Sequence, residues 1–216
     1  MSTYTKRIIM SIFGVVICGL SVGMFKHAAF GVDPFQALMS GLDAVIPIRF
    51  GTLYVIVNLL LLVFSLVMDR RKIGHATFIN LFLLGYVVEF SQAQCEKLFP
   101  AIGIGGRVLL LLTGLVILSL ASALYFTADL GVSTYDAVAI VMSKKWKWGK
   151  FKYIRICTDL VCVVAGAVLF VAAGNPIGRI PTIVGIGTIV TAFFMGPLID
   201  LFHSKIARPL LGKEGK

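Results

Sequence analysis

The chain has little charge. Asp, Glu, Lys and Arg make up 14% of its 216 residues, against roughly 25% in ordinary soluble domains. Apolar residues make up 58%, and the mean hydropathy is +0.96. No soluble domain of any size fits between the apolar runs. We therefore expect a single all-α transmembrane domain over residues 1–216, with the lipid bilayer as its partner.

The sequence also lacks the motifs of several functional classes. Its four cysteines, at 18, 95, 157 and 162, form no CxxC pair, so no disulfide framework, zinc site or other metal site is indicated. It contains no G-x-S-x-G, H-E-x-x-H or Walker motif, and we expect neither an enzyme nor a cofactor. The net charge is +10, but no basic stripe with interleaved aromatics exists outside the apolar runs, which excludes a nucleic-acid partner.

Six apolar runs are present, each about the twenty residues needed to cross a bilayer core of roughly 30 Å. Lys6 and Arg7 precede the first run, but residues 8–25 carry no charge and no small-x-small cleavage site follows. We expect a retained spanning helix there, and not a signal peptide. The runs cover about 7–28, 51–68, 74–93, 107–128, 153–173 and 180–201.

Two short polar interruptions occur at matching places. Residues 31–37 read GVDPFQA and residues 131–137 read GVSTYDA. They open the helix-like segments 33–46 and 133–143, and thirteen or so residues reach only about 20 Å as a helix. Lipid cannot satisfy such a backbone, so each break must be buried in protein or line a cavity. Paired interruptions in two halves indicate a transporter's binding site.

The repeat extends beyond these breaks. Arg7 and Gly14 match Arg107 and Gly114 at the same offset. A pattern of G-x-x-T, seven residues, G, three residues and an acid ends each half. Its members are Gly74, Thr77, Gly85 and Glu89, then Gly185, Thr188, Gly196 and Asp200. Two copies of one unit, at about 7–93 and 107–204, therefore fill nearly the whole chain.

The distribution of basic residues predicts the orientation. With six spans and a cytoplasmic N-terminus, fifteen of the twenty basic residues lie inside, and the C-terminus is cytoplasmic too. Those fifteen are Lys6, Arg7, Arg70, Arg71, Lys72, Lys144, Lys145, Lys147, Lys150, Lys152, Arg155, Lys205, Arg208, Lys213 and Lys216. Three spans per half then make a 3+3 inverted repeat, each half with a short re-entrant or interfacial helix. A parallel repeat of four crossings per half is the alternative.

The two short helices have clear start signals. Asp33 can cap a helix and Pro34 suits its first position, while Ser133 and Thr134 offer the same capping chemistry. Each helix would point its positive dipole end into the protein, which favours an anionic group. Because Asp33 neutralises its own helix end, the Ser133 end is the better anion site.

Several polar residues are candidates for the site. Gln36 opens a polar stripe on the first short helix, which either lines a cavity or faces water at the interface. Asp159 lies inside the fifth run and is either functional or an i,i+4 partner of Arg155. Asn58 holds the corresponding place in the second run. The candidate substrate-binding residues are Gly31, Asp33, Gln36, Asn58, Gly131, Ser133, Thr134, Tyr135, Asp136 and Asp159.

Glu89 and Asp200 end the third and sixth runs at symmetric positions. They are candidates for coupling-ion sites in driven transport. The alternative is that both are carboxylates at a membrane boundary.

The repeated GVDPFQA and GVSTYDA motifs, with the G-x-x-T…G…acid endings, resemble the YczE/YitT-related group of bacterial membrane proteins. The resemblance covers essentially the full length and implies a multi-pass protein of the bacterial plasma membrane. The family supplies no substrate that could be carried over. Because Ser133-Thr134 replaces Asp33-Pro34 in the second copy, the two half-sites need not be equivalent.

Together these features favour a small transporter or exporter of a small metabolite, with an anionic one indicated by the Ser133 helix end. Its site would lie near the bilayer midplane between the short helices. One alternative is a substrate-binding membrane subunit of a larger transport complex. Another is an accessory membrane protein without a ligand. Glycine-rich faces and a thin six-helix wall are also compatible with a homodimer.

Overall fold

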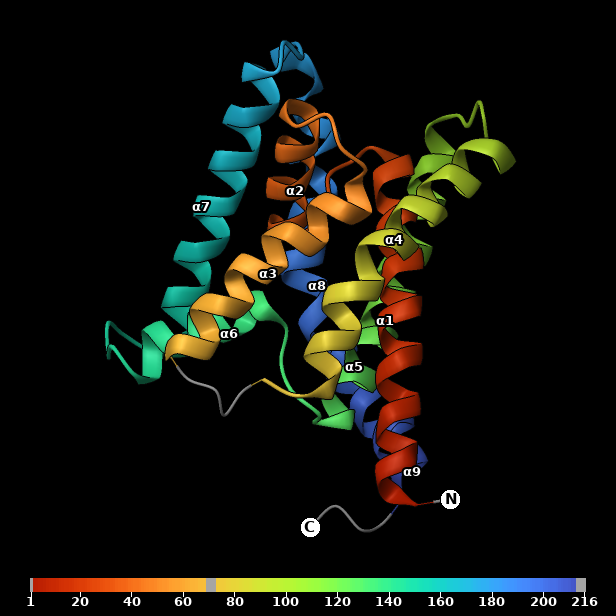
Figure 1. Ribbon diagram of the computed structural model, residues 1–216. Helices are drawn as coiled ribbons and strands as arrows, with labels where there is room; N and C mark the ends of the chain where they lie inside the picture. Colours follow the sequence, from red (N-terminus) through yellow and green to blue (C-terminus); the bar gives the residue numbers. More distant parts are fainter. Residues whose placement is uncertain (1, 69–72, 213–216) are drawn as a thin grey trace.

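A computed structural model describes residues 2–68 and 73–212. Within these ranges all regular structure is helical (Figure 1). The elements are α1 (Thr3–Ala28), α2 (Pro34–Val45), α3 (Phe50–Met68), α4 (His75–Leu98), α5 (Ile104–Ala128), α6 (Thr134–Lys144), α7 (Phe151–Ala172), η2 (Ile177–Thr182), α8 (Ile186–Phe202), η3 (His203–Ala207) and α9 (Arg208–Leu211). Five basic residues used for the orientation lie outside the described residues: Arg70, Arg71, Lys72, Lys213 and Lys216.

The six expected spans are confirmed. In the part of the chain that the structure describes, six helical stretches are long and apolar enough to cross a membrane: α1, α3, α4, α5, Tyr153–Ala172 within α7, and Ile177–Leu211. The two expected short helices also form, as α2 with 12 residues and α6 with 11. At 1.5 Å per residue they are about 16–18 Å long, too short to cross a bilayer core.

The sixth run, expected over about 180–201, is interrupted. The chain forms the 3-10 helix η2, breaks at residues 183–185, and begins α8 at Ile186. Pro181 lies inside η2 and has no N–H for a continuing helix. The break leaves the Ile183 carbonyl free to accept a hydrogen bond from the Val32 N–H, at 3.1 Å. The interruption is therefore a docking point for the first polar break.

The third run also ends elsewhere than expected. Helix α4 continues to Leu98, so Glu89 lies within the helix and not at its end. Its carboxylate accepts a hydrogen bond from the Gly51 N–H at the start of α3, at 3.2 Å, and lies 3.9 Å from Arg49.

The backbone repeats its conformation across the two polar breaks. Helices α1 and α5 both end on a left-handed residue, Ala29 with φ 53° and Asp129 with φ 49°. Two residues later, Gly31 and Gly131 have φ of 100° and 121°, a region that favours glycine. The sharp turn expected from the glycine of each motif is thus present in both halves.

Each half of the chain holds the polar break of the other half. The Thr77 hydroxyl, at the start of α4, donates to the Val132 carbonyl at 2.7 Å. The Thr188 hydroxyl, at the start of α8, donates to the Val32 carbonyl at 2.8 Å. The G-x-x-T motif of one copy therefore binds the GV motif of the other, and the two halves are interlocked by equivalent contacts.

Each short helix packs on a long helix of the opposite half, and α6 also packs on one of its own half. Helix α2 packs mainly on α7, and α6 packs on α3 and α7, while α1 and α5 lie against each other. Figure 1 places α2 in the upper part of the molecule and α6 in the lower part. The start of α1 and the short α9 lie together at the lower end, which also carries the end of α6 and the start of α7.

The α2–α7 contact is especially close because two glycines face each other. A Cβ built on Gly41 would lie 2.3 Å from the Gly166 carbonyl oxygen, and one on Gly166 would lie 2.5 Å from the Ala37 oxygen. In α6, the residue one hundred positions after Gly41 is Val141, which is buried. The two short helices are therefore packed differently, because the sequence has glycine at this position in α2 and valine at the equivalent position in α6.

Candidate binding site

The two short helices meet at their N-termini. The rings of Phe35 and Tyr135, in the first turns of α2 and α6, stack with centroids 4.9 Å apart and planes 22° apart. Both predicted caps form. The Asp33 carboxylate accepts from the Gln36 N–H at 3.2 Å, and the Ser133 hydroxyl accepts from the Asp136 N–H at 3.1 Å.

A cavity of about 590 Å³ lies at this meeting point. Its volume falls within the roughly 300–1,000 Å³ of small-molecule sites. All six long helices and both short ones contribute to its wall. The contributions of α4, α5 and α7, such as Asn80, Ser122 and Arg155, come from the part of each helix nearer the end with the chain termini. The cavity therefore extends from the helix tips toward that end.

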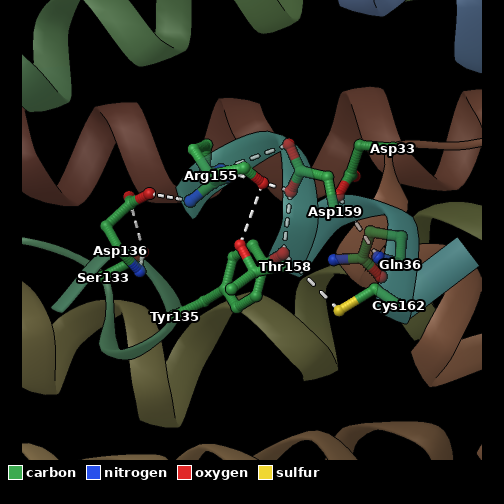
Figure 2. A network of polar contacts seen from close by, with 9 residues as sticks. All are labelled: Asp33, Gln36, Ser133, Tyr135, Asp136, Arg155, Thr158, Asp159 and Cys162. Atoms are coloured by element: carbon green, nitrogen blue, oxygen red, sulfur yellow. Dashed lines mark hydrogen bonds and ion pairs between the residues drawn. The ribbon is translucent and has the colours of Figure 1, made fainter. Parts of the chain in front are cut away.

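One wall of the cavity carries a polar network centred on Arg155 (Figure 2). Its guanidinium forms an ion pair with Asp136 and a second with Asp159, whose Oδ1 lies 3.2 Å from Nε. The Tyr135 hydroxyl donates to the same Asp159 oxygen at 2.7 Å. The guanidinium carbon also lies 4.3 Å from the centre of the Tyr135 ring. The expected i,i+4 pair of Asp159 with Arg155 is thus present, and Asp159 also lines the cavity.

The carboxylate of Asp33 stands apart from this network. It lies beyond Asp159 as seen from Arg155 (Figure 2). Among the described residues, no basic side chain forms an ion pair with it. The charged residues of the wall are Asp33, Asp136, Asp159 and Arg155. Three carboxylates against one guanidinium give the ionised wall an excess of negative charge.

This charge pattern disfavours the anionic ligand expected from the helix ends. Asp136 lies in the first turn of α6, and its carboxylate accepts from the Ser133 hydroxyl at 2.7 Å. The positive end of α6 is therefore already faced by a carboxylate of the same turn, as the end of α2 is by Asp33.

Two polar atoms of the cavity wall are buried without a partner in the described part of the chain. They are Gln36 Oε1 and Tyr125 Oη, and their side chains are 3% and 7% exposed. Buried polar groups in proteins are nearly always hydrogen-bonded. These two atoms therefore mark the place where a ligand or water would complete the site.

Most of the predicted substrate-binding residues come together here. The cavity wall contains Asp33, Gln36, Asn58, Ser133, Tyr135, Asp136 and Asp159. Both ends of the Asn58 amide are engaged, since its nitrogen donates to the Tyr54 carbonyl at 2.8 Å and its oxygen accepts from the Thr134 hydroxyl. Thr134, Gly31 and Gly131 support the tips without lining the cavity.

The two coupling-ion candidates lie elsewhere. Glu89 is engaged near the start of α3, as described above, and Asp200 is an exposed residue of α8. Neither belongs to the wall of this cavity. The structure therefore does not place the two coupling-ion candidates at the central cavity.

Sequence reasoning missed six polar residues of the wall: Tyr54, Asn80, Ser122, Tyr125, Arg155 and Thr191. Arg155 was counted as a cytoplasmic boundary charge because it follows a run of lysines. Its i,i+4 spacing to Asp159 was the available signal. The Tyr54 hydroxyl donates to Asn80 at 3.3 Å, a contact between helices that spacing along one helix cannot predict.

Comparison with known proteins gives a family but no activity. The sequence profile of a family of unknown function, DUF6198, matches residues 5–204. The chain is 23% identical over 201 residues to the uncharacterized protein YyaS of Bacillus subtilis, covering 93% of this chain and 94% of YyaS. It is 24% identical over 190 residues to the uncharacterized membrane protein YczE of the same species, covering 86% and 80%. An uncharacterized Haemophilus influenzae protein is 22% identical over 204 residues, covering 94% and 86%.

No solved structure matches the chain. The expected relationship to YczE is confirmed by these findings. The matches cover between 80% and 94% of each relative's own length, so the similarity is not confined to one segment of the chain.

Proposed function

The chain belongs to the DUF6198 family of membrane proteins, and from that premise we propose that it is a small transporter or exporter of a metabolite, and not an enzyme. The observation that carries the proposal is the meeting of two half-length helices, tip to tip, at a cavity of about 590 Å³. Broken or half-length helices that end at a central site are typical of secondary transporters.

A second cavity supports a route through the protein. It has a volume of about 330 Å³ and runs along α2, and its wall includes Lys26, Ser40 and Asp43. Val32 lines this cavity, while the next residue, Asp33, lines the central one. The first polar break therefore lies between two cavities, as a closed gate would.

The interlocked halves suit alternating access. We propose that they form an inverted repeat, with α2 and α6 entering from opposite faces of the membrane. The equivalent contacts of Thr77 and Thr188 and the repeated turns at Gly31 and Gly131 support this. Inverted repeats exchange two arrangements by rocking one element against another. In this arrangement the central cavity would be closed on the side where Gly41 of α2 contacts Gly166 of α7. It would be open on the side where α3 and α6 lie.

The proposed setting is a bacterial plasma membrane with both termini in the cytoplasm. The basic residues near the lower end of the molecule support that orientation under the positive-inside rule. The central cavity would then open toward the cytoplasm. The outward face of α7 carries exposed apolar side chains, including Leu160, Val164 and Val168, which suit lipid tails. A homodimer through such a face stays a prediction.

The proposal can be tested by the accessibility of single cysteines. We would replace the four native cysteines and introduce either Ser122→Cys, in the central cavity, or Ala44→Cys, at an exposed position of the second one. Membrane-impermeant maleimide is added to right-side-out and inside-out vesicles. In the parent chain we expect Ser122→Cys to react only from the cytoplasmic face and Ala44→Cys only from the outer face.

A substitution at the close contact between α2 and α7 should produce the second, outward-open arrangement. Gly41→Val removes the close approach to Gly166 and should favour the outward-open arrangement, so that Ser122→Cys becomes reactive from the outer face. Gly105→Val is the matched control, because a Cβ at Gly105 would meet no atom within 4 Å. Reaction of Ser122→Cys from both faces in the parent chain would indicate a channel. Reaction from one face in every variant would contradict transport.

A further inference from the structure

We infer that the central cavity binds a small organic cation, with the Asp33 carboxylate facing its ammonium group. The inference rests on the proposed function, since it names the class of metabolite that the transporter would carry. It departs from the anionic ligand suggested by the helix ends alone. Three observations carry it: the charge of the wall, the unpartnered polar atoms and the aromatic rings.

The charge of the wall calls for a cation. Arg155 is shared between Asp136 and Asp159, and among the described basic residues none pairs with Asp33. A carboxylate removed from bulk water is costly unless an opposite charge accompanies it. An ammonium group next to Asp33 would supply that charge without disturbing the Arg155 network.

The unpartnered atoms call for a hydrogen-bond donor. The backbone N–H of Gln36 donates to the Asp33 carboxylate, which caps the helix. The Gln36 side chain therefore belongs to the same helical turn that Asp33 caps. Its buried Oε1 is an acceptor, and the buried Tyr125 oxygen can accept as well. A primary ammonium carries three N–H donors, and unpartnered acceptors of this kind are suited to such donors.

The rings favour an organic cation over a bare ion. Phe35, Tyr54, Tyr125 and Tyr135 belong to one buried cluster and all line the cavity. Aromatic faces attract cations, and most strongly where water is excluded. The volume of about 590 Å³ is far larger than a metal ion needs. Among the described residues, no three His, Cys, Asp or Glu side chains form a group that could hold one.

Three probes of nearly equal shape test the inference: benzylammonium, benzyl alcohol and benzoate. Their binding to the full chain in lipid nanodiscs is measured by isothermal titration calorimetry at neutral pH. We expect benzylammonium to bind at least about tenfold more tightly than either other probe, a difference of about 1.4 kcal/mol. Equal binding of the three probes, tighter binding of benzoate, or no binding of benzylammonium would overturn the inference.

The variants locate the site. Asp33→Asn keeps an equally good helix cap while removing the charge, so the fold should be retained. It should weaken benzylammonium binding at least about tenfold, or about 1.4 kcal/mol. Asp43→Asn is the matched control, because Asp43 is on the same helix but lines the second cavity. Unchanged binding in Asp33→Asn, or an equal loss in Asp43→Asn, would overturn the assignment.

The two proposals fail separately. If benzylammonium binds through Asp33 but Ser122→Cys never becomes reactive from the outer face, the cation site stands and transport falls. If that cysteine alternates between faces while benzylammonium binds no better than benzoate, transport stands and the cation site falls.

Discussion

Phe35 and Tyr135 are one hundred positions apart in the chain, occupy the same place in the two copies of the repeat, and stack on each other in the structure. Contact between equivalent residues is what a two-fold relation produces at its axis. The two short helices therefore meet at the point where the halves of the molecule face each other, and the central cavity lies at that point.

This stack should be measurable as a coupling energy. Phe35→Leu and Tyr135→Leu, alone and together, should show a coupling of about 0.5–1.5 kcal/mol in the free energy of unfolding. Denaturation by SDS in mixed micelles supplies the values. Phe64→Leu combined with Phe35→Leu is the control pair, because Phe64 contacts Trp146 instead. Additive effects of Phe35→Leu and Tyr135→Leu would show that the rings do not stabilise the tips.

The exchanged threonine contacts predict equivalent losses in the two halves. Thr77→Val and Thr188→Val keep the side-chain shape but leave the Val132 and Val32 carbonyls without a donor. Each should lower the unfolding free energy by about 1–3 kcal/mol. Thr52→Val, at an exposed hydroxyl contact, should change it by less than about 0.5 kcal/mol. A loss in only one of the two variants would contradict the interlocked arrangement.

Much of this architecture could be predicted from the sequence, for identifiable reasons. The caps at Asp33 and Ser133 and the turns at Gly31 and Gly131 depend on local chemistry, so they were visible in the motifs. The sequence did not reveal whether each G-x-x-T motif contacts the GV motif of its own half or of the other half, because Thr77 and Thr188 have the same pattern around them. The contact of Thr77 with Val132 is made between segments far apart in the chain.

The features of the site that the sequence did not predict also depend on how neighbouring groups are placed in space. The ligand charge was inferred from helix ends, while the carboxylate of Asp136 was not weighed against the end of its own helix. Arg155 looked like a boundary charge because the neighbouring lysines are. The break before Ile186 was hidden by an apolar stretch whose hydropathy is continuous, although Pro181 and Gly185 were present in it.

The left-handed glycines should tolerate no side chain. Gly131→Ala would place a Cβ 2.6 Å from the Gly74 nitrogen, on a backbone with φ 121°. We expect a loss of at least about 2 kcal/mol in the unfolding free energy, or failure to accumulate in the membrane. Gly149→Ala is the control, since nothing lies within 4 Å of a Cβ there. Comparable yields and melting temperatures for the two variants would refute the requirement for glycine.

The Arg155 network predicts a rescue by charge removal. Arg155→Gln leaves Asp136 and Asp159 as neighbouring carboxylates without their cation. Because these side chains are between 26% and 31% exposed, we expect a loss of about 1–3 kcal/mol, below the cost of a fully buried pair. Adding Asp136→Asn and Asp159→Asn should recover part of the loss. A triple variant less stable than Arg155→Gln would contradict this account of the network.

The central claim is that α2 and α6 enter the membrane from opposite faces and meet at the cavity. It is tested most directly by labelling a single cysteine placed just after each short helix, at Ile48 or Trp148, which are 39% and 67% exposed. A variant without native cysteines carries one or the other, and intact cells are treated with membrane-impermeant maleimide before and after permeabilisation. The account predicts that Ile48→Cys reacts in intact cells and Trp148→Cys only after permeabilisation. Reaction of both from the same face would contradict it.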